Sequence, residues 1–120
     1  MVGFEKLEVW KNGCRLAVEV YQALNACRDH GLRDQMQRAA VSIPSNVAEG
    51  AERQSKKDFV KFLYIAKGSS AELRTQLYIA GKSGMLSLAV CNELTIHCKQ
   101  VSGQLQKLIS SLKGSSDSAP

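Results

Sequence analysis

The amino-acid sequence predicts an all-α protein, an antiparallel up-down four-helix bundle. Apolar residues recur at steps of three and four along four segments, and no segment shows the period of two that is typical of a strand. The breaks between the segments are short, as between antiparallel neighbours in a bundle. The chain has 120 residues, enough for one core. We therefore expect a single domain over residues 1–113, followed by a disordered serine-rich tail over residues 114–120.

The first segment carries two apolar stripes, offset by about 100° around the helix. One stripe suffices for packing inside a bundle, so the second predicts contact with another subunit, a homo-oligomer. A wide core face in a monomer is the alternative. We expect this helix to end at Asp29, His30 and Gly31, because a glycine just past the last turn can close a helix. The stripes are Leu7, Trp10, Cys14, Ala17, Tyr21 and Leu24, and Val9, Gly13, Leu16, Val20, Ala23 and Cys27.

The second segment runs from about Leu32 to Gly50 and contains a proline. Pro44 lacks a backbone N–H and crowds the carbonyl four residues earlier, so it kinks a helix or breaks it. We expect a kink near Pro44. Apolar residues recur on one face of this segment, which predicts that this face packs on the core. They are Met36, Ala40, Ile43 and Val47.

A polar stripe follows the same helix beside its apolar face. Glutamine, serine and asparagine gain little inside a helix unless their side chains bond something. We therefore expect a structural network between helices or subunits, in which Arg38 or Arg53 pairs with Glu49 or Glu72. A solvated face is the alternative. The stripe consists of Gln35, Arg38, Ser42, Asn46, Glu49 and Arg53.

The third helix is predicted to begin at Ser55, whose hydroxyl can accept a hydrogen bond from a free amide of the first turn. Small residues from Ala66 to Ala71 predict a close approach of neighbouring backbones in mid-helix. Gly81 and Gly84 predict a short turn. The fourth helix has an uninterrupted apolar stripe of Cys91, Leu94, Cys98, Val101, Leu105, Leu108 and Leu112.

The sequence contains no recognisable catalytic motif. There is no Gly-rich phosphate loop, no nucleophile elbow and no Glu-x-x-His pair of the kind that holds metals in helical bundles. His97 stands alone, and we expect it to be solvated or hydrogen-bonded. The cysteines lack the spacing of a zinc site and are expected to be thiols. The sequence therefore predicts no enzyme, no metal and no cofactor. The cysteines are Cys14, Cys27, Cys91 and Cys98.

The charge balance favours an anionic partner. Lysine and arginine number 16 and aspartate and glutamate 11, a net charge of +5, although a binding surface also requires that the cations cluster. There is no secretion leader and no run of about 18 apolar residues, so we expect a cytoplasmic protein that does not enter a membrane.

Two long motifs resemble a known family. They are "QMQRAAVSIPSNVAEGAERQS" from Gln35 and "FVKFLYIAKGSSAEL" from Phe59. They are similar to the four-helix-bundle proteins encoded in intervening sequences of bacterial large-subunit ribosomal RNA genes, a family that includes the accessory variability protein of diversity-generating retroelements. "FEKLEVWKNG" also resembles the family's start, so the resemblance covers Phe4 to about Leu112. One departure is "DHGLRDQ", which lacks the Phe-Pro that often precedes the second helix.

The resemblance implies a closed pentameric ring with a basic surface suited to nucleic acid. In the retroelement members the ring resembles an adaptor that binds the reverse transcriptase and its RNA template, without catalysis of its own. The family signature falls on positions that we interpret as architectural. They are Arg38, Ser42, Pro44, Asn46, Glu49, Gly50, Gly68, Ser69 and Glu72.

The expected function is therefore that of a nonenzymatic protein that binds nucleic acid or acts as an adaptor. The alternative is a structural or protein-interaction module with no nucleic-acid role. Phosphate contacts are expected from exposed cations near helix starts, although each of these could also serve solubility alone. The candidates are Lys11, Arg15, Lys56, Lys57 and Lys61.

Overall fold

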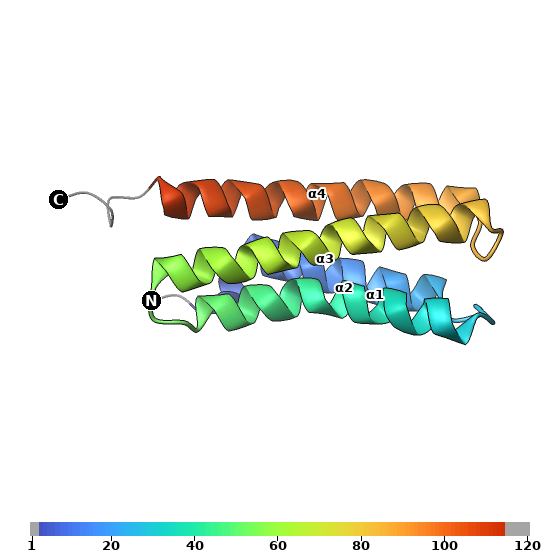
Figure 1. Ribbon diagram of the computed structural model, residues 1–120, viewed down its shortest axis with the longest axis horizontal. Coiled ribbons are helices and arrows are strands. Elements are labelled where there is room, and N and C mark those ends of the chain that lie inside the picture. Colours follow the sequence, from blue (N-terminus) through green and yellow to red (C-terminus); the bar gives the residue numbers. More distant parts are fainter. Residues whose placement is uncertain (1–2, 115–120) are drawn as a thin grey trace.

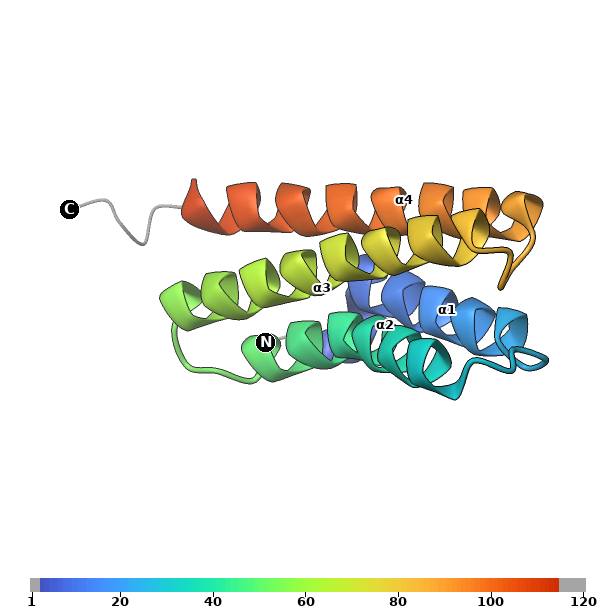
Figure 2. The same ribbon diagram turned by 45° about the vertical axis from the view of Figure 1, so that its right-hand side comes forward.

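Four long helices lie side by side in the structure, a computed structural model that describes residues 3–114 (Figure 1). A short 3-10 helix, η1 (Phe4–Lys6), precedes α1 (Glu8–Ala23), α2 (His30–Ala51), α3 (Lys56–Lys82) and α4 (Leu88–Lys113). α1 and α3 run in one direction and α2 and α4 in the other, and each helix packs against the next, with α4 against α1 (Figures 1 and 2). The predicted up-down four-helix bundle is confirmed. Of the predicted tail over residues 114–120, only Gly114, the C-cap of α4, is described, and residues 115–120 lie outside the described residues.

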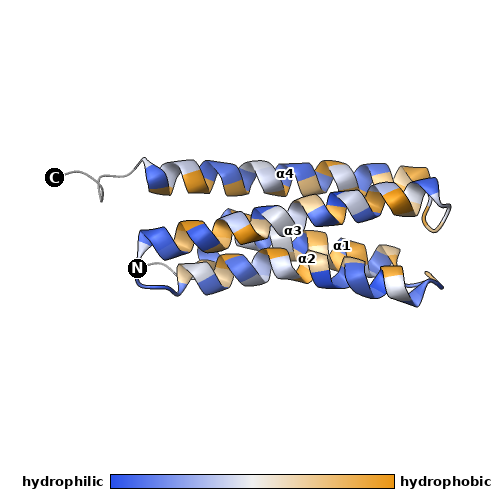
Figure 3. Ribbon diagram, viewed as in Figure 1, coloured by the Kyte–Doolittle hydropathy of each residue, from blue (hydrophilic) through white to orange (hydrophobic). Residues whose placement is uncertain are grey.

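The core runs along the axis of the bundle, and all four helices contribute to it. Hydrophobic and hydrophilic residues alternate along each ribbon, as expected when one face of a helix is buried (Figure 3). Truncating such a buried side chain to alanine costs about 2 to 5 kcal/mol, so these residues dominate the stability of the fold. The largest fully buried side chains are Leu16, Leu24, Met36, Ile43, Leu63, Leu73, Leu77, Leu105 and Ile109.

The two apolar stripes of α1 have different surroundings. Most of the stripe from Val9 to Cys27 is buried, and Gly13 lets α1 approach α2, since a Cβ built on it would lie 3.5 Å from Pro44 Cβ. The stripe from Leu7 to Leu24 is buried only in part, and its Tyr21 is 46% exposed. The stripe from Val9 to Cys27 is therefore the one that packs mostly inside the chain.

The predicted end of the first helix is wrong. α1 ends at Ala23, and the chain turns before Asp29. The Asp29 carboxylate accepts a hydrogen bond from the Leu32 amide at 3.0 Å and so caps the start of α2. Gly31 lies inside the first turn of α2. The Asp-His-Gly run starts a helix here, because an aspartate at the cap satisfies amides that would otherwise have no partner.

α2 passes through Pro44 as one helix, so the proline does not break it. The C-terminal end of α2 packs closely on the start of α3. A Cβ built on Gly50 would lie 2.7 Å from Phe62 Cβ, a distance that real Cβ atoms essentially never show. Glycine is therefore required at position 50 by the closeness of the two helices.

The predicted start of α3 is confirmed, and so is a turn at Gly84, although Gly81, the other glycine expected to bound this turn, lies inside α3. Ser55 Oγ accepts a hydrogen bond from the Asp58 amide at 3.1 Å. Gly84, with φ of +81°, takes the left-handed conformation, and Ser87 caps α4. The explanation for the small residues of α3 holds only in part. Ser70 is fully buried, but a Cβ on Gly68 would meet nothing within 4 Å, so Gly68 is not at a helix contact within the chain.

Candidate nucleic-acid interface

The predicted phosphate-binding cations lie at one end of the bundle but on two separate helices. Lys11 and Arg15 are exposed on α1, and Lys56, Lys57 and Lys61 are exposed at the start of α3. α1 and α3 run in the same direction, so their first turns share an end of the bundle (Figure 1). The two helices occupy diagonal positions and do not pack against each other. The five residues thus form two groups at one end of the molecule.

Further cations lie at the same end, because α2 and α4 finish where α1 and α3 begin (Figure 1). All of them are exposed, and they outnumber the carboxylates of that end. We call this set the basic end. It consists of Lys6, Lys11, Arg15, Arg53, Lys56, Lys57, Lys61, Lys107 and Lys113.

Several cations of the basic end have partners within the chain. Lys11 Nζ lies 3.6 Å from Glu8 Oε1, and the Arg53 guanidinium donates to Glu49 Oε2 at 2.9 Å and lies 4.7 Å from the centre of the Phe62 ring. These ion pairs are exposed, and such pairs contribute about 0 to 1 kcal/mol each. A phosphate can therefore replace the carboxylate at little cost.

The polar stripe of α2 divides into an inner and an outer part. Ser42 Oγ lies 2.8 Å from Ser69 Oγ of α3, and the Asn46 amide donates to Ser42 Oγ at 2.9 Å, so these three residues link α2 to α3. The Glu49–Arg53 ion pair is exposed. Gln35, Arg38 and Glu72 are also exposed, and a network between subunits stays a prediction.

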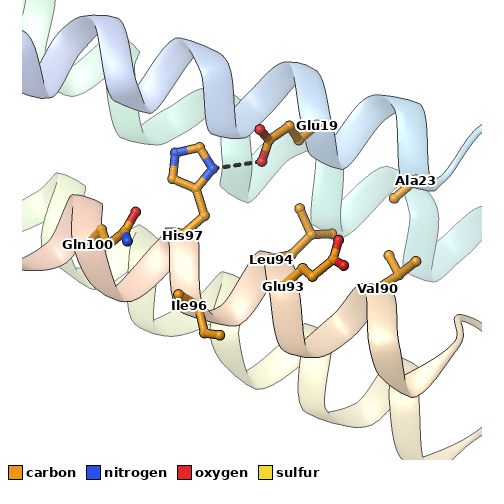
Figure 4. Close-up of a pocket in the computed structure, with 8 residues that line it drawn as sticks. All are labelled: Glu19, Ala23, Val90, Glu93, Leu94, Ile96, His97 and Gln100. Atoms are coloured by element: carbon orange, nitrogen blue, oxygen red, sulfur yellow. Dashed lines mark hydrogen bonds and ion pairs between the residues drawn. The ribbon is translucent and has the colours of Figure 1, made fainter.

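A second polar feature lies at the groove between α1 and α4, where His97 is hydrogen-bonded, one of the two states expected for it, in a link between helices that was not predicted. His97 of α4 has a largely buried side chain and faces Glu19 of α1 (Figure 4). Its Nδ1 lies 2.7 Å from Glu19 Oε1, and its Nε2 lies 2.7 Å from Asn12 Oδ1. The Asn12 amide nitrogen in turn donates to Gln104 Oε1 at 2.9 Å. This chain of hydrogen bonds joins α1 to α4 along the groove.

The orientation of the Asn12 amide follows from its neighbours. The Arg15 guanidinium lies 3.4 Å from the same oxygen that faces His97, and a flipped amide would point its NH₂ group at this donor. Both ring nitrogens of His97 therefore face oxygen atoms. A neutral ring carries one N–H and can donate to only one of them, whereas the protonated ring donates to both. Through these two contacts His97 of α4 is bound to two residues of α1 and so links the two helices.

The thiols show no feature of a reactive or metal-binding site. Burial raises the pKa of the Cys14, Cys91 and Cys98 thiols, which keeps them protonated near neutral pH. Within residues 3–114, no three histidine, cysteine or acidic residues converge in a way that could hold a metal ion. In the same part of the chain, no helix has the length and apolarity to cross a membrane.

The sequence profile of the 23S rRNA-intervening sequence protein family matches residues 5–107. The chain belongs to this family. A crystal structure from Bacteroides thetaiotaomicron, a protein of unknown function from the S23 ribosomal protein family, resembles this intervening-sequence protein with a TM-score of 0.79 and 22% identity. The match covers 84% of this chain and 97% of that one, and it agrees with the bundle fold. Among curated proteins, no sequence matches the chain.

Several signature residues of this intervening-sequence protein lie where α2 meets α3. Ser42, Asn46 and Ser69 form the hydrogen-bonded link between the helices, and Gly50 permits their close approach. This supports the architectural interpretation of these positions. The cations of the basic end, in contrast, are exposed.

Proposed function

We propose that this intervening-sequence protein is a nonenzymatic protein that binds nucleic acid or acts as an adaptor, and that it assembles into a pentameric ring. The observation that carries the proposal is the excess of exposed cations at the basic end. Cations that neutralise phosphates release the counterions of the nucleic acid, a source of affinity that does not depend on base sequence. RNA or DNA would be held by its phosphates, with little sequence preference.

Assembly would strengthen such binding. A ring repeats the contacts of each subunit around its axis, so that weak phosphate contacts act together on one strand. Lys57 and Lys61 lie four residues apart on α3 and share a face, and Lys56 flanks them. These three lysines are the best placed to act as one group.

The exposed apolar side chains of α1 and α2 support self-assembly. Val18 is 55% exposed, Tyr21 46% and Val41 40%. Tyr21 and Val41 line a groove of about 520 Å³ between the two helices, together with Arg38 and Ser42 of the polar stripe. A second copy that covered this groove would bury apolar surface that the single chain leaves in water, which favours association.

The same exposed surface also favours a second candidate function, a protein-interaction module without a nucleic-acid role. The resemblance to retroelement accessory proteins would make a reverse transcriptase the partner in that setting. The two candidates differ in their dependence on salt, because phosphate contacts weaken steeply as salt increases and apolar contacts do not.

Filter binding of a generic single-stranded RNA at several salt concentrations tests the proposal. We expect binding at about 50 mM salt that falls steeply toward 200 mM. Replacing Lys56, Lys57 and Lys61 with glutamate should abolish most of it. Absence of binding at the lower salt would contradict the nucleic-acid role and leave the protein-interaction module.

Light scattering coupled to size exclusion tests the ring. We expect a mass of five subunits, and a mass near 13.1 kDa would contradict self-assembly. A dimer would contradict the pentamer but keep the covered α1–α2 groove.

A further inference from the structure

A groove between α3 and α4 lies at the other end of the bundle from most of the predicted cations. It has a volume of about 410 Å³ and runs between the last turns of α3 and the first turns of α4. Its floor is apolar and comes from Leu77, Gly81 and Cys91. Its other lining residues are Arg74, Tyr78, Lys82, Leu88, Asn92, Thr95 and Lys99.

All charged residues that line this groove are cations. Arg74 and Lys82 of α3 lie eight residues apart, two helical turns and about 12 Å along one face. Lys99 lines the groove from α4. No aspartate or glutamate lines it, and none of the three cations forms an ion pair with a carboxylate of the described chain. Three positive charges without a counter-charge attract an anion into the groove.

Arg74 is the cation whose side chain is set most deeply. Its Nε is shielded from solvent and has no hydrogen-bond partner within the described residues. Its charge also reaches the neighbouring Cys98, where it opposes the rise in pKa that burial of that thiol causes. A buried guanidinium donor without an acceptor is unusual, since nearly all such groups are bonded. Because this Nε is shielded, an anion in the open groove would interact with the charge of the Arg74 guanidinium and not with Nε itself.

Tyr78 provides an aromatic surface beside these charges. Its side chain is 67% exposed, and Lys82 Nζ lies 5.7 Å from the centre of its ring. Leu88 across the groove is 61% exposed. An exposed aromatic ring next to cations is the arrangement on which a base stacks while its phosphate is neutralised. Asn92 and Thr95 add polar groups on the α4 side.

From these observations we infer that the α3–α4 groove is a nucleotide-binding site, in which Arg74 and Lys99 hold a phosphate and Tyr78 stacks on the base. The nucleotide is either free or one unit of a single-stranded nucleic acid. The second case rests on the proposed function, whereas the first is independent of it.

The chain contains a matched control for Tyr78. Tyr64 lies nearer the start of the same helix and is 45% exposed, and Lys113 Nζ lies 5.7 Å from the centre of its ring. Each ring therefore has a lysine ammonium at the same distance from its centre, although Lys113 Nζ also donates to the Tyr64 hydroxyl at 3.4 Å. They differ in that Tyr78 lines the groove that holds Arg74 and Lys99.

The first test is a titration of the isotope-labelled full chain with AMP, adenosine or inorganic phosphate, followed by NMR. AMP should shift the backbone amides of residues 74–82 and 88–99 and bind more tightly than either of its parts. Tyr78→Ala should weaken AMP binding about fivefold or more, while Tyr64→Ala leaves it unchanged. Lys99→Gln should weaken both AMP and phosphate, and this exposed position avoids the risk that Arg74→Gln perturbs folding. Absence of shifts in the groove, or equal losses for the two tyrosine variants, would overturn the inference.

Competition between AMP and a single-stranded oligoribonucleotide separates this inference from the proposed function. RNA that displaces AMP supports the groove as a site for one unit of a strand. If AMP binds and the RNA does not, the groove is supported as a site for free nucleotides and the proposed function fails. RNA binding by a protein that does not bind AMP would overturn the groove and leave the proposed function standing.

Discussion

The two ends of the bundle both carry positive charge but arrange it in different ways. At the basic end the cations are spread over the ends of all four helices, all are exposed, and some pair with carboxylates. In the α3–α4 groove only three cations are present, but no carboxylate lines the groove and an exposed tyrosine stands beside them. A count of charges along the sequence identifies the basic end, but it does not identify the α3–α4 groove. The arrangement around each cation decides what it can bind.

This difference has a physical consequence for recognition. Contacts to phosphates carry no information about the base sequence, so the basic end can attract a phosphate chain without selecting its bases. A groove with an aromatic wall contacts the base as well as the phosphate. The basic end therefore suits capture, and the groove suits recognition of a nucleotide unit.

Substitutions of two glycines test the close contact between α2 and α3 at the basic end. Gly50→Ala should destabilise the protein by about 1 to 3 kcal/mol, because the new Cβ would lie 2.7 Å from Phe62 Cβ at the joint between α2 and α3. Gly68→Ala is the matched control, and it should stabilise the chain by up to about 1 kcal/mol, since alanine is the better helix former and its Cβ meets nothing. Urea unfolding measures both. Equal effects would show that the close approach at Gly50 is not what the joint requires.

The link between α1 and α4 should be weaker than this joint. His97→Ala removes the group that faces both Glu19 and Asn12, and we expect a loss of about 1 to 2 kcal/mol in the free energy of unfolding. Gln100→Ala, an exposed position in the same groove, should stay within about 0.5 kcal/mol of the wild type. Similar unfolding midpoints for the two variants would mean that the hydrogen-bond chain contributes nothing.

The buried Cys98 thiol of α4 makes stability depend on pH. Burial raises the pKa of Cys98 above its ordinary value of 9.0, so the unfolded chain loses this proton first as the pH rises. Stability is therefore full below about pH 9 and falls above it, by at most about 1.4 kcal/mol per pH unit for this one group. Cys98→Ala should reduce the slope measured between pH 9 and 10.5, and an unchanged slope would assign the loss to other groups.

Much of the fold follows from local patterns in the sequence. The four apolar stripes, the Ser55 cap and the turn at Gly84 depend on residues that are close in the chain, and the structure agrees with each. The end of α1 was mistaken because Asp29 and Gly31 can mark either the end of one helix or the start of the next. Such a choice depends on which segment packs on the core.

The α3–α4 groove and the α1–α4 link could not be predicted from the sequence, for a different reason. Arg74 and Lys99 come from two helices and meet only through the register in which α3 packs on α4. The same holds for Asn12 and His97, which are 85 residues apart. Charge counting identified lysines at the start of α3, since those are adjacent in sequence, and it overlooked cations that the fold brings together.

The most direct measurement of the central claim is the RNA affinity of two variants with the same change in charge. One replaces Lys57 and Lys61 of the basic end with glutamate, and the other replaces Arg28 and Arg33 at the opposite end, with the fold of both checked by circular dichroism. At about 50 mM salt we expect the first variant to lose at least tenfold in affinity, with a shallower salt dependence, and the second to lose less than threefold. Equal losses would show that RNA responds to net charge alone and would contradict a binding surface at the basic end.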